Sequence, residues 1–267
     1  MKPAKFDYER PTDLAGALAL LGAQERDVKP LAGGQSLGPM LNLRLAQPEL
    51  LVDIAKLAEM RRVEDGTDAV TIGACVTHAA IEDAKVPDPT NGMLRAVAGG
   101  IAYRAVRNRG TIGGSLAHAD PAADWPSALA ALGAEALIVG PNGRRTVAVA
   151  GLMLGMFTTV LEPGELIEAV RVPRLSPQAR WGYYKLTRKA GEFAHAIGAV
   201  VRDPARGINR AVIGATGGAP IVIDDAAPLF ADPAAIAAIV DASPLADDPY
   251  ERQIHIVALE RALKQAV

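Results

Sequence analysis

Two short glycine-rich segments are the residues of this chain whose types and spacing best suit anion binding. Ala32 to Ser36 reads AGGQS and Thr111 to Ser115 reads TIGGS, so each places two glycines directly before a polar residue. Glycine leaves room for backbone N–H groups to converge on phosphate oxygens, and a following helix adds a favourable dipole. Together, the first glycine segment (Ala32–Ser36) and the second glycine segment (Thr111–Ser115) would suit a pyrophosphate.

Neither segment carries one of the common nucleotide-binding fingerprints. No GK[ST] follows, as in a Walker A loop, and neither segment fits GxGxxG. A single Gly-Gly-polar turn is more often a tight structural connection. Two matching turns, each after an apolar element, make a binding role about as probable as a structural one, and both readings stay open from the residues alone.

A dinucleotide would need further contacts along the chain. Nanomolar binding requires about 12 kcal/mol, whereas a helix dipole contributes about 1 kcal/mol. The candidates are Asp124 for a sugar hydroxyl, Ile101 for a flat apolar contact and Lys185 for flavin or phosphate oxygens.

Composition narrows the class of protein. The chain has 267 residues with 50% hydrophobic content, enough for a full core, and 28 basic against 30 acidic residues give a net charge of -2 without a basic stripe. We therefore expect no nucleic-acid binding. No apolar run is long enough to cross a bilayer and no signal peptide is evident, so we expect no membrane span and a cytoplasmic location.

Cysteine and histidine usage argues against a metal centre on this chain. An iron–sulfur cluster is usually held by four thiolates, and this chain offers only Cys75. Its four histidines show no ligand spacing. Any such cluster would therefore lie on another subunit, and Cys75, within an apolar stretch read as strand, is expected to be a buried small hydrophobe.

The elements that must position these residues are mixed helices and strands. We predict a helix capped by Thr12 and ending near Gly22, a strand that precedes the first glycine segment, and an apolar helix followed by a charged stretch before the second. The predicted helices are 38–45, 77–84, 93–101, one through 128–132, 233–240 and 249–266, and the predicted strands are 28–31, 50–54, 70–74, 136–139, 145–149, 166–172, 182–186, 195–201, 211–215 and 221–223. The absence of regular βαβ alternation predicts an α+β fold, with a domain boundary at the prolines of 173–178.

Three stretches resemble one known family. They are Pro30 to Leu45 (PLAGGQSLGPMLNLRL), Val106 to Asp124 (VRNRGTIGGSLAHADPAAD) and Tyr184 to Phe193 (YKLTRKAGEF). They are similar to the medium, flavin-binding subunits of aerobic carbon monoxide dehydrogenases and related members of the xanthine dehydrogenase family, which are molybdenum hydroxylases. The resemblance covers nearly the whole chain; Ser115 replaces an Asn common among relatives, Trp125 follows Asp124 where Glu or Leu is common, and the chain is somewhat short after Gly218.

The resemblance implies a fold and a cofactor. Residues 1–175 would form a two-lobed FAD-binding domain of the vanillyl-alcohol-oxidase (PCMH) type, with lobes of about 1–57 and 58–175, and residues 176–267 a smaller α+β domain. The implied FAD contacts are Leu31, Ala32, Gly33, Gly34, Gln35, Ser36, Leu37, Gly38, Ile101, Thr111, Ile112, Gly113, Gly114, Ser115, Asp124, Ile167, Glu168 and Lys185, with backbone contact at Ile167 and Glu168; Tyr184 could cover a flavin face, although aromatic packing is favoured about two to one.

The resemblance also implies partners. Molybdenum cofactor on a large subunit and two [2Fe-2S] clusters on a small subunit would pass electrons to this FAD, in a dimer of heterotrimers, and an external quinone, NAD or oxygen would receive them. No residue of this chain is then catalytic. Two alternatives remain: a free-standing flavin oxidase or reductase, and a non-enzymatic scaffold whose glycine turns are structural. The substrate and the acceptor are not set by the sequence.

Two further groups have competing interpretations. Arg104, Arg107 and Arg109 could steer an anionic ligand, face a partner or form a solvated helix surface. His118 and Asp120 could be imagined as a catalytic dyad, but no nucleophile with an oriented base accompanies them. We therefore expect no catalytic dyad there.

Overall fold

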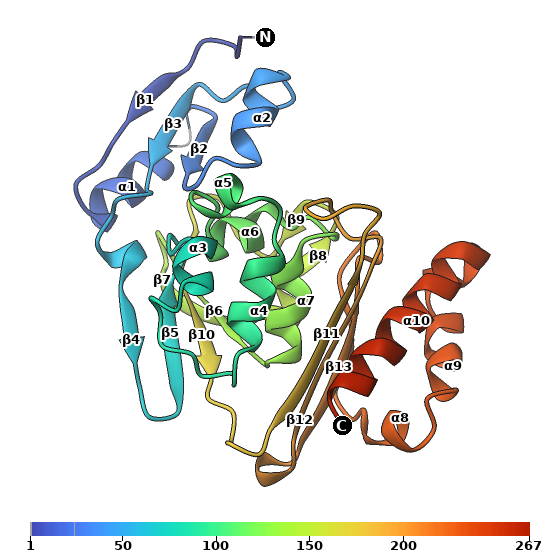
Figure 1. The fold of residues 1–267 in the computed structure, drawn as a ribbon. Coiled ribbons are helices and arrows are strands. Elements are labelled where there is room, and N and C mark those ends of the chain that lie inside the picture. The colour runs from blue at the N-terminus through green and yellow to red at the C-terminus, as the bar shows by residue number, and fades with distance from the viewer. Residues whose placement is uncertain (1, 24) are drawn as a thin grey trace.

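A three-stranded parallel sheet forms the small lobe coloured blue in Figure 1. The computed structural model describes residues 2–23 and 25–267. The lobe contains β1 (Asp7–Glu9), α1 (Leu14–Leu21), β2 (Val28–Leu31), α2 (Leu37–Asn42) and β3 (Leu50–Asp53). The apolar β3 is central and fully buried, with β1 and β2 beside it. Because β2 ends at Leu31, the first glycine segment leaves the carboxyl edge of this sheet.

A five-stranded antiparallel sheet of order β4-β5-β10-β6-β7 forms the middle of the molecule. Its helices lie on one side of it, as the green ribbons of Figure 1 show. The elements are η1 (Glu59–Arg61), β4 (Val63–Asp65), β5 (Ala69–Gly73), α3 (His78–Glu82), α4 (Met93–Gly100), α5 (Arg104–Arg107), α6 (Ile112–His118), α7 (Asp124–Ala131), β6 (Glu135–Gly140), β7 (Gly143–Ala148), η2 (Val149–Gly151), β8 (Met153–Gly155), β9 (Thr158–Thr159) and β10 (Leu166–Pro173).

A four-stranded antiparallel sheet, β11-β12-β13-β14, follows the link through Ser176. The long helix α10 packs on β11 and β12, and α7 packs on β12 and β13 from the middle part of the chain. The elements are β11 (Arg180–Leu186), β12 (Ala196–Asp203), η3 (Pro204–Arg206), β13 (Ile208–Gly214), β14 (Ile221–Ile223), α8 (Ala227–Ala231), α9 (Ala235–Asp241), η4 (Pro244–Asp247) and α10 (Pro249–Gln265).

The strands β8 and β9 form a separate two-stranded antiparallel sheet. The predicted α+β class is confirmed by these four sheets and their helices. The sheets lie within residues 7–53, 63–173 and 180–223. The domain boundaries near 57 and 175 stay predictions. No helix in the described ranges has both the length and the hydropathy to cross a membrane.

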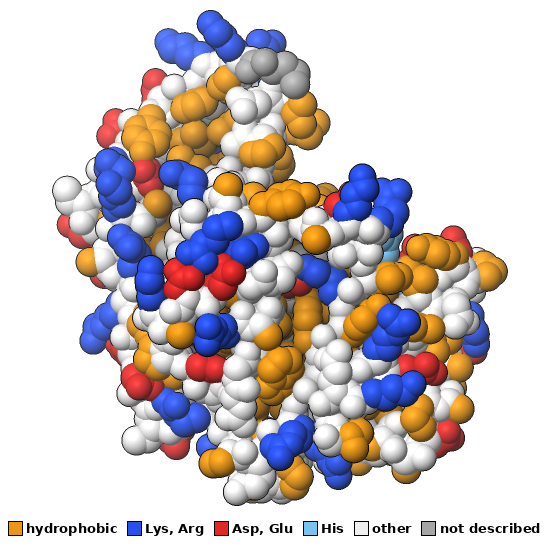
Figure 2. Space-filling view, in the orientation of Figure 1, with side chains coloured by type: hydrophobic (Ala, Val, Ile, Leu, Met, Phe, Trp, Pro, Cys, Tyr) orange, Lys and Arg blue, Asp and Glu red, His pale blue; other side chains and the backbone are white. Residues whose placement is uncertain are grey.

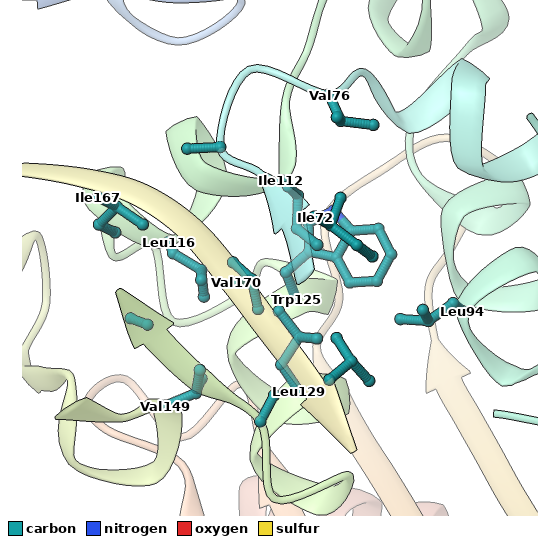
Figure 3. Packing of buried hydrophobic residues seen from close by; sticks show 14 of the residues in the cluster. Ile72, Val76, Leu94, Ile112, Leu116, Trp125, Leu129, Val149, Ile167 and Val170 are labelled. Carbon is teal, nitrogen blue, oxygen red and sulfur yellow. The ribbon is translucent and has the colours of Figure 1, made fainter. Parts of the chain in front are cut away.

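The main core centres on Trp125, which is fully buried. Figure 3 shows its indole next to Ile72 of β5 and Ile112 of α6, with Leu129 further along α7. A second cluster fills the space between the C-terminal sheet and α8 to α10. Because Ile112 packs in the same core as Trp125, helix α6 is anchored in the main core.

Several predicted details of the first lobe are wrong. The first helix is capped by Asp13, whose carboxylate accepts from the Gly16 N–H, and not by Thr12. The next helix was expected to run to Leu45 but ends at Asn42; Arg44 turns the chain back with a φ of 58°. The strand β1 was not predicted, because its three exposed residues show no alternation of buried and exposed positions. Its pairing with β3 defines it as a strand.

Two details of the middle part also differ from the prediction. The second glycine segment is not a free turn, because Thr111 caps α6 and Gly113 and Gly114 lie in its first turn. Cys75 is buried as expected but lies just beyond β5 rather than within a strand. Burial raises the pKa of its thiol to about 12, so it stays protonated.

Candidate functional site

The first glycine segment forms a turn with unused donors. Gly34 has a φ of 69°, a conformation that glycine adopts without steric cost, and the Gly38 N–H closes the turn onto the Gly34 carbonyl at 2.9 Å. Within residues 2–23 and 25–267, no protein acceptor takes the N–H groups of Gly33 to Ser36. Successive free N–H groups around a left-handed residue are a recurrent anion-binding arrangement.

The structure brings the two glycine segments into contact. A Cβ placed on Gly33 would lie 2.7 Å from the carbonyl carbon of Arg109 and 2.9 Å from the Cα of Gly110. Ala32 likewise lies against Gly114. Figure 1 shows the connection between β2 and α2 directly above α5 and α6. Only glycine at position 33 permits this approach, and the contact joins the small lobe to the middle of the molecule.

The second glycine segment uses its donors within the protein. The N–H groups of Ile112 and Gly113 donate to the carbonyls of Val76 and Ala74 at 3.1 and 2.9 Å. Gly114 donates to the Thr111 hydroxyl at 3.1 Å, and Ser115 donates to the Thr111 carbonyl at 3.0 Å. This segment therefore contributes shape and close packing, and its contact with a cofactor stays a prediction.

A second cluster joins α4, α7 and β11. The Lys185 ammonium donates to the Gly100 carbonyl at 2.8 Å and forms an ion pair with Asp124 at 2.9 Å. Both side chains are largely buried, with exposures of 14% and 8%. Ile101 follows Gly100 directly and packs against the core. The sequence candidates Ile101, Asp124 and Lys185 thus lie together, although they are far apart in the chain.

Tyr183 completes this cluster, and sequence reasoning missed it. Its hydroxyl donates to Asp124 at 2.7 Å. Burial, and then the Asp124 carboxylate, raise the pKa of this phenol well above its usual value, so it remains a donor. The available signal was strand alternation, which puts residues 183 and 185 on one face.

The same alternation places the Tyr184 side chain elsewhere. It packs against the residues around α10 and lies under the guanidinium of Arg261, 4.8 Å from the ring centroid. The prediction that Tyr184 covers a flavin is therefore not supported by its position, and the aromatic packing favoured in the sequence is what the structure has.

Ile167 and Glu168 lie at an irregularity of β10. The Glu168 carbonyl accepts from the Ala74 N–H at 2.9 Å, and the Ala74 carbonyl accepts from Gly113. The Glu168 carboxylate pairs with Arg144. These two residues therefore reach the second glycine segment through backbone, by way of Ala74.

The arginine group near the second glycine segment is committed to ion pairs. Arg107 binds Glu82 through two nitrogens, and Arg104 binds Asp83 and Glu82. Figure 2 shows blue and red side chains side by side over this part of the molecule. Arg109 contributes its carbonyl to the Gly33 contact. The neighbouring carboxylates balance the positive charges of Arg104 and Arg107, so these two arginines leave little net charge to steer an anionic ligand.

A surface cavity lies away from the predicted residues. It has a volume of about 540 Å³ and is lined by the Asp120 to Ala122 loop, Phe157, His195 and the N-terminal turn of α10. None of the predicted cofactor residues lines it. The His118 ring lies tilted against Phe157, with ring centroids 5.0 Å apart, and does not bond to Asp120 in the described structure. The backbone geometry of the glycine segments, and not this cavity, marks the candidate pyrophosphate site.

Comparison with known proteins shows the family of the chain. Residues 4–175 match the family described as FAD binding domain in molybdopterin dehydrogenase. The carbon monoxide dehydrogenase medium chain of Hydrogenophaga pseudoflava is 42% identical over 201 residues, 75% of this chain and 70% of the relative. The 6-hydroxypseudooxynicotine dehydrogenase complex subunit alpha of Paenarthrobacter nicotinovorans is 37% identical over 84% of this chain and 76% of its own.

Solved structures match over the whole chain. The carbon monoxide dehydrogenase of Hydrogenophaga pseudoflava that lacks the Mo-pyranopterin moiety of the molybdenum cofactor superposes with a TM-score of 0.90 at 36% identity, covering 100% of this chain and 98% of that one. Quinoline 2-oxidoreductase from Pseudomonas putida 86 gives 0.81 at 28% identity, covering 100% and 98%. The chain belongs to the FAD-binding medium subunits of the molybdenum hydroxylase family and is an oxidoreductase component.

Proposed function

We propose that this chain holds FAD across the contact between its two glycine segments and connects a partner's iron–sulfur clusters to an external electron acceptor. The observation that carries the proposal is the packing of Gly33 on Arg109 and Gly110, because it joins the free donors of the first segment to the backbone that leads directly into the second. The family match supplies the identity of the ligand.

The residues present fit a flavin dinucleotide. The free N–H groups of Gly33 to Ser36 suit the pyrophosphate, and the hydroxyls of Ser36 and Ser115 can add donors. The proposed contacts are Leu31 to Gly38, Ile101, Thr111 to Ser115, Asp124, Lys185 and the backbone at Ile167 and Glu168. The Tyr184 side chain is left out because it faces α10.

FAD would supply the exchange between one-electron transfer from iron–sulfur clusters and two-electron delivery to an acceptor. The chain's own residues bind and orient it. Lys185 brings a positive charge into a largely buried cluster, and Asp124 and Gly100 fix the position of that charge. Because the Asp124 carboxylate balances this charge, the pair would act on a nearby ligand as an oriented dipole and not as a net cation.

The partners follow from the family and not from this chain's surface. We propose a large subunit with the molybdenum cofactor, where substrate is oxidised, and a small subunit with two [2Fe-2S] clusters, assembled as a dimer of heterotrimers. Relatives include a medium chain and a complex subunit by name. The acceptor class (quinone, NAD or oxygen) and the cytoplasmic location remain predictions.

The proposal is tested by the visible spectrum of the purified full chain, alone and co-expressed with a large and a small subunit. We expect about one flavin per chain and reduction of that flavin by the holoenzyme's substrate only when all subunits are present. A chain without flavin under both conditions would contradict the proposal. Steady substrate turnover by the isolated chain would instead support a free-standing oxidase.

A further inference from the structure

His78 lies under the contact between the two glycine segments and belongs to none of the predicted cofactor residues. It is 5% exposed, at the start of α3, and its backbone N–H donates to the Gly110 carbonyl at 2.9 Å. Thr77, the residue before it, pairs with Thr111 across an antiparallel bridge. Backbone bonds therefore tie residues 76–78 to the chain that enters the second glycine segment.

The His78 ring supports Gly110 from the side. A Cβ on Gly110 would lie 2.8 Å from Nε2 and 2.9 Å from Cδ2 of His78. The Cα of Gly110 is also an atom on which Gly33 rests. Gly110 thus joins two contacts, one to the His78 ring and one to the first glycine segment, so a shift of the ring changes the spacing of the two segments.

Trp125 fixes the orientation and the protonation state of this ring. Its indole Nε1–H donates to His78 Nδ1 at 3.1 Å, and Trp125 itself is fully buried. Nδ1 must therefore carry a lone pair and not a proton. In Figure 3 the Trp125 ring lies among Ile72, Ile112 and Leu129, so the donor cannot easily move away.

The charged groups around His78 oppose its protonation. Burial and then the positive charge of Arg107 on α5 lower the pKa of His78 to about 4. Glu82, one turn along α3, is already taken by Arg107. Asp124, next to Trp125 on α7, is directed to Lys185 and Tyr183. No described carboxylate is therefore paired with the imidazole.

We infer that His78 is a positioning residue for FAD: as a neutral imidazole held by Trp125, it sets the position of Gly110 and so the spacing of the two segments that bind the pyrophosphate. Protonation would put an N–H opposite the Trp125 N–H, break that bond and loosen the contact of Gly110 with Gly33. The inference rests on the proposed FAD site and adds that His78 must be neutral for this site to keep its geometry.

The test measures the rate of FAD release from the full chain between pH 7 and pH 4, through the fluorescence of the freed flavin. Wild type should release FAD increasingly fast as the pH falls. His78→Asn, whose Oδ1 replaces Nδ1 as acceptor for Trp125, should release FAD at the wild-type rate at pH 7 and show a much flatter pH profile. His78→Leu removes the acceptor and should release FAD about tenfold faster at pH 7, the effect of one unsatisfied buried donor.

His255→Gln is the matched control, because His255 is also buried but lies in the C-terminal part, bonded to carbonyls of Glu251 and Ala215. It should keep the wild-type pH profile of FAD release. Identical pH profiles of FAD release in wild type and His78→Asn would overturn the inference. This comparison decides the question even where His78→Leu does not fold. A wild-type chain that binds no FAD at any pH would instead overturn the proposed function.

Discussion

The two glycine segments have nearly the same sequence form, yet they differ in how they use their backbone. The first leaves the N–H groups of Gly33 to Ser36 without protein acceptors in the described chain and turns through a left-handed Gly34. The second donates from four successive residues, 112 to 115, to acceptors of its own protein. One segment is therefore a set of donors and the other a rigid support.

The difference shows that a glycine pair in a sequence indicates where two backbones approach closely, but not whether that approach serves ligand binding or internal packing. At Gly33 the approach joins two lobes, whereas at Gly113 a Cβ would lie 2.8 Å from the Cα of Ala74 within one lobe. Substitutions in the first segment should therefore act mainly on cofactor binding, and those in the second mainly on the stability of the FAD-free chain.

The largest effect is expected for Gly33→Ala. The added methyl would overlap Arg109 and push the two segments apart, which separates the donors from their support. We expect FAD to bind about 1,000-fold more weakly, or about 4 kcal/mol, as measured by titration of the apo-chain. Gly151→Ala, whose methyl meets open space, is the control; equal FAD affinity in both variants would break the comparison.

Acid should weaken the support that the His78 ring gives to Gly110 before it unfolds the rest of the candidate site. Because the pKa of His78 is lowered from 6.5 to about 4 in the folded chain, the unfolded chain binds the proton first. The stabilisation is complete above pH 6.5 and falls as the pH drops towards 4, by about 3 kcal/mol between pH 7 and pH 4. Urea unfolding of the FAD-free chain at both pH values measures it.

Carboxylates such as Glu82 and Glu165, whose pKa values are lowered by their arginine partners, also lose stabilisation in acid. The His78→Asn chain keeps them and isolates the histidine contribution. The prediction fails if wild type and His78→Asn lose the same free energy of unfolding between the two pH values.

Gly113→Ala should destabilise the chain even without flavin. Its methyl would overlap Ala74, whose backbone is fixed by bonds to Gly113 and Glu168. Overpacking of this kind costs about 2 kcal/mol. We expect the free energy of unfolding to fall by that amount in the FAD-free chain. A variant that is fully stable yet fails to bind FAD would mean that the second segment acts as a donor set after all.

Thr111→Ala should have a smaller effect. It removes the hydroxyl that accepts from the Gly114 N–H and caps α6, a loss of about 1 kcal/mol for a helix cap. Thr111→Ser keeps the acceptor and should retain the wild-type unfolding midpoint. Equal destabilisation by Ala and Ser would show that packing of the Thr111 methyl, and not its cap, matters.

The smallest effect is a change in chemical protection at Cys75. This residue lies between Ala74 and Val76, which accept from the second segment, and its thiol is buried with a raised pKa of about 12. Iodoacetamide at pH 8 should therefore not modify it in the wild-type chain. In Gly113→Ala the reaction should become measurable; modification at the same slow rate in both chains would mean that the support is intact.

Much of this arrangement was predictable, because the signals were local. The apolar runs of β3, β5 and β12 and the residue motifs led to the α+β class, and the glycine pairs marked where backbones approach. The contact of Gly33 with Gly110 and the partnership of His78 with Trp125 were not predictable, since they join residues distant in sequence through shape and not through periodicity. Strand alternation shows that the Tyr183 and Tyr184 side chains lie on opposite faces of the strand, but the sequence does not show which of the two faces is the inner one.

The strand β11 imposes a constraint on how this chain can vary. Its residues 183 and 185 face Asp124, while Gly182 meets the backbone of α10 at Ala262 and Tyr184 meets Arg261. Inserting or deleting one residue between 180 and 185 would exchange the two faces, turning the Lys185 ammonium towards α10 and a bulky side chain into the glycine contact. Length changes should thus be tolerated in the loops around β11 but not within this strand, whose register holds Lys185 on the Asp124 side.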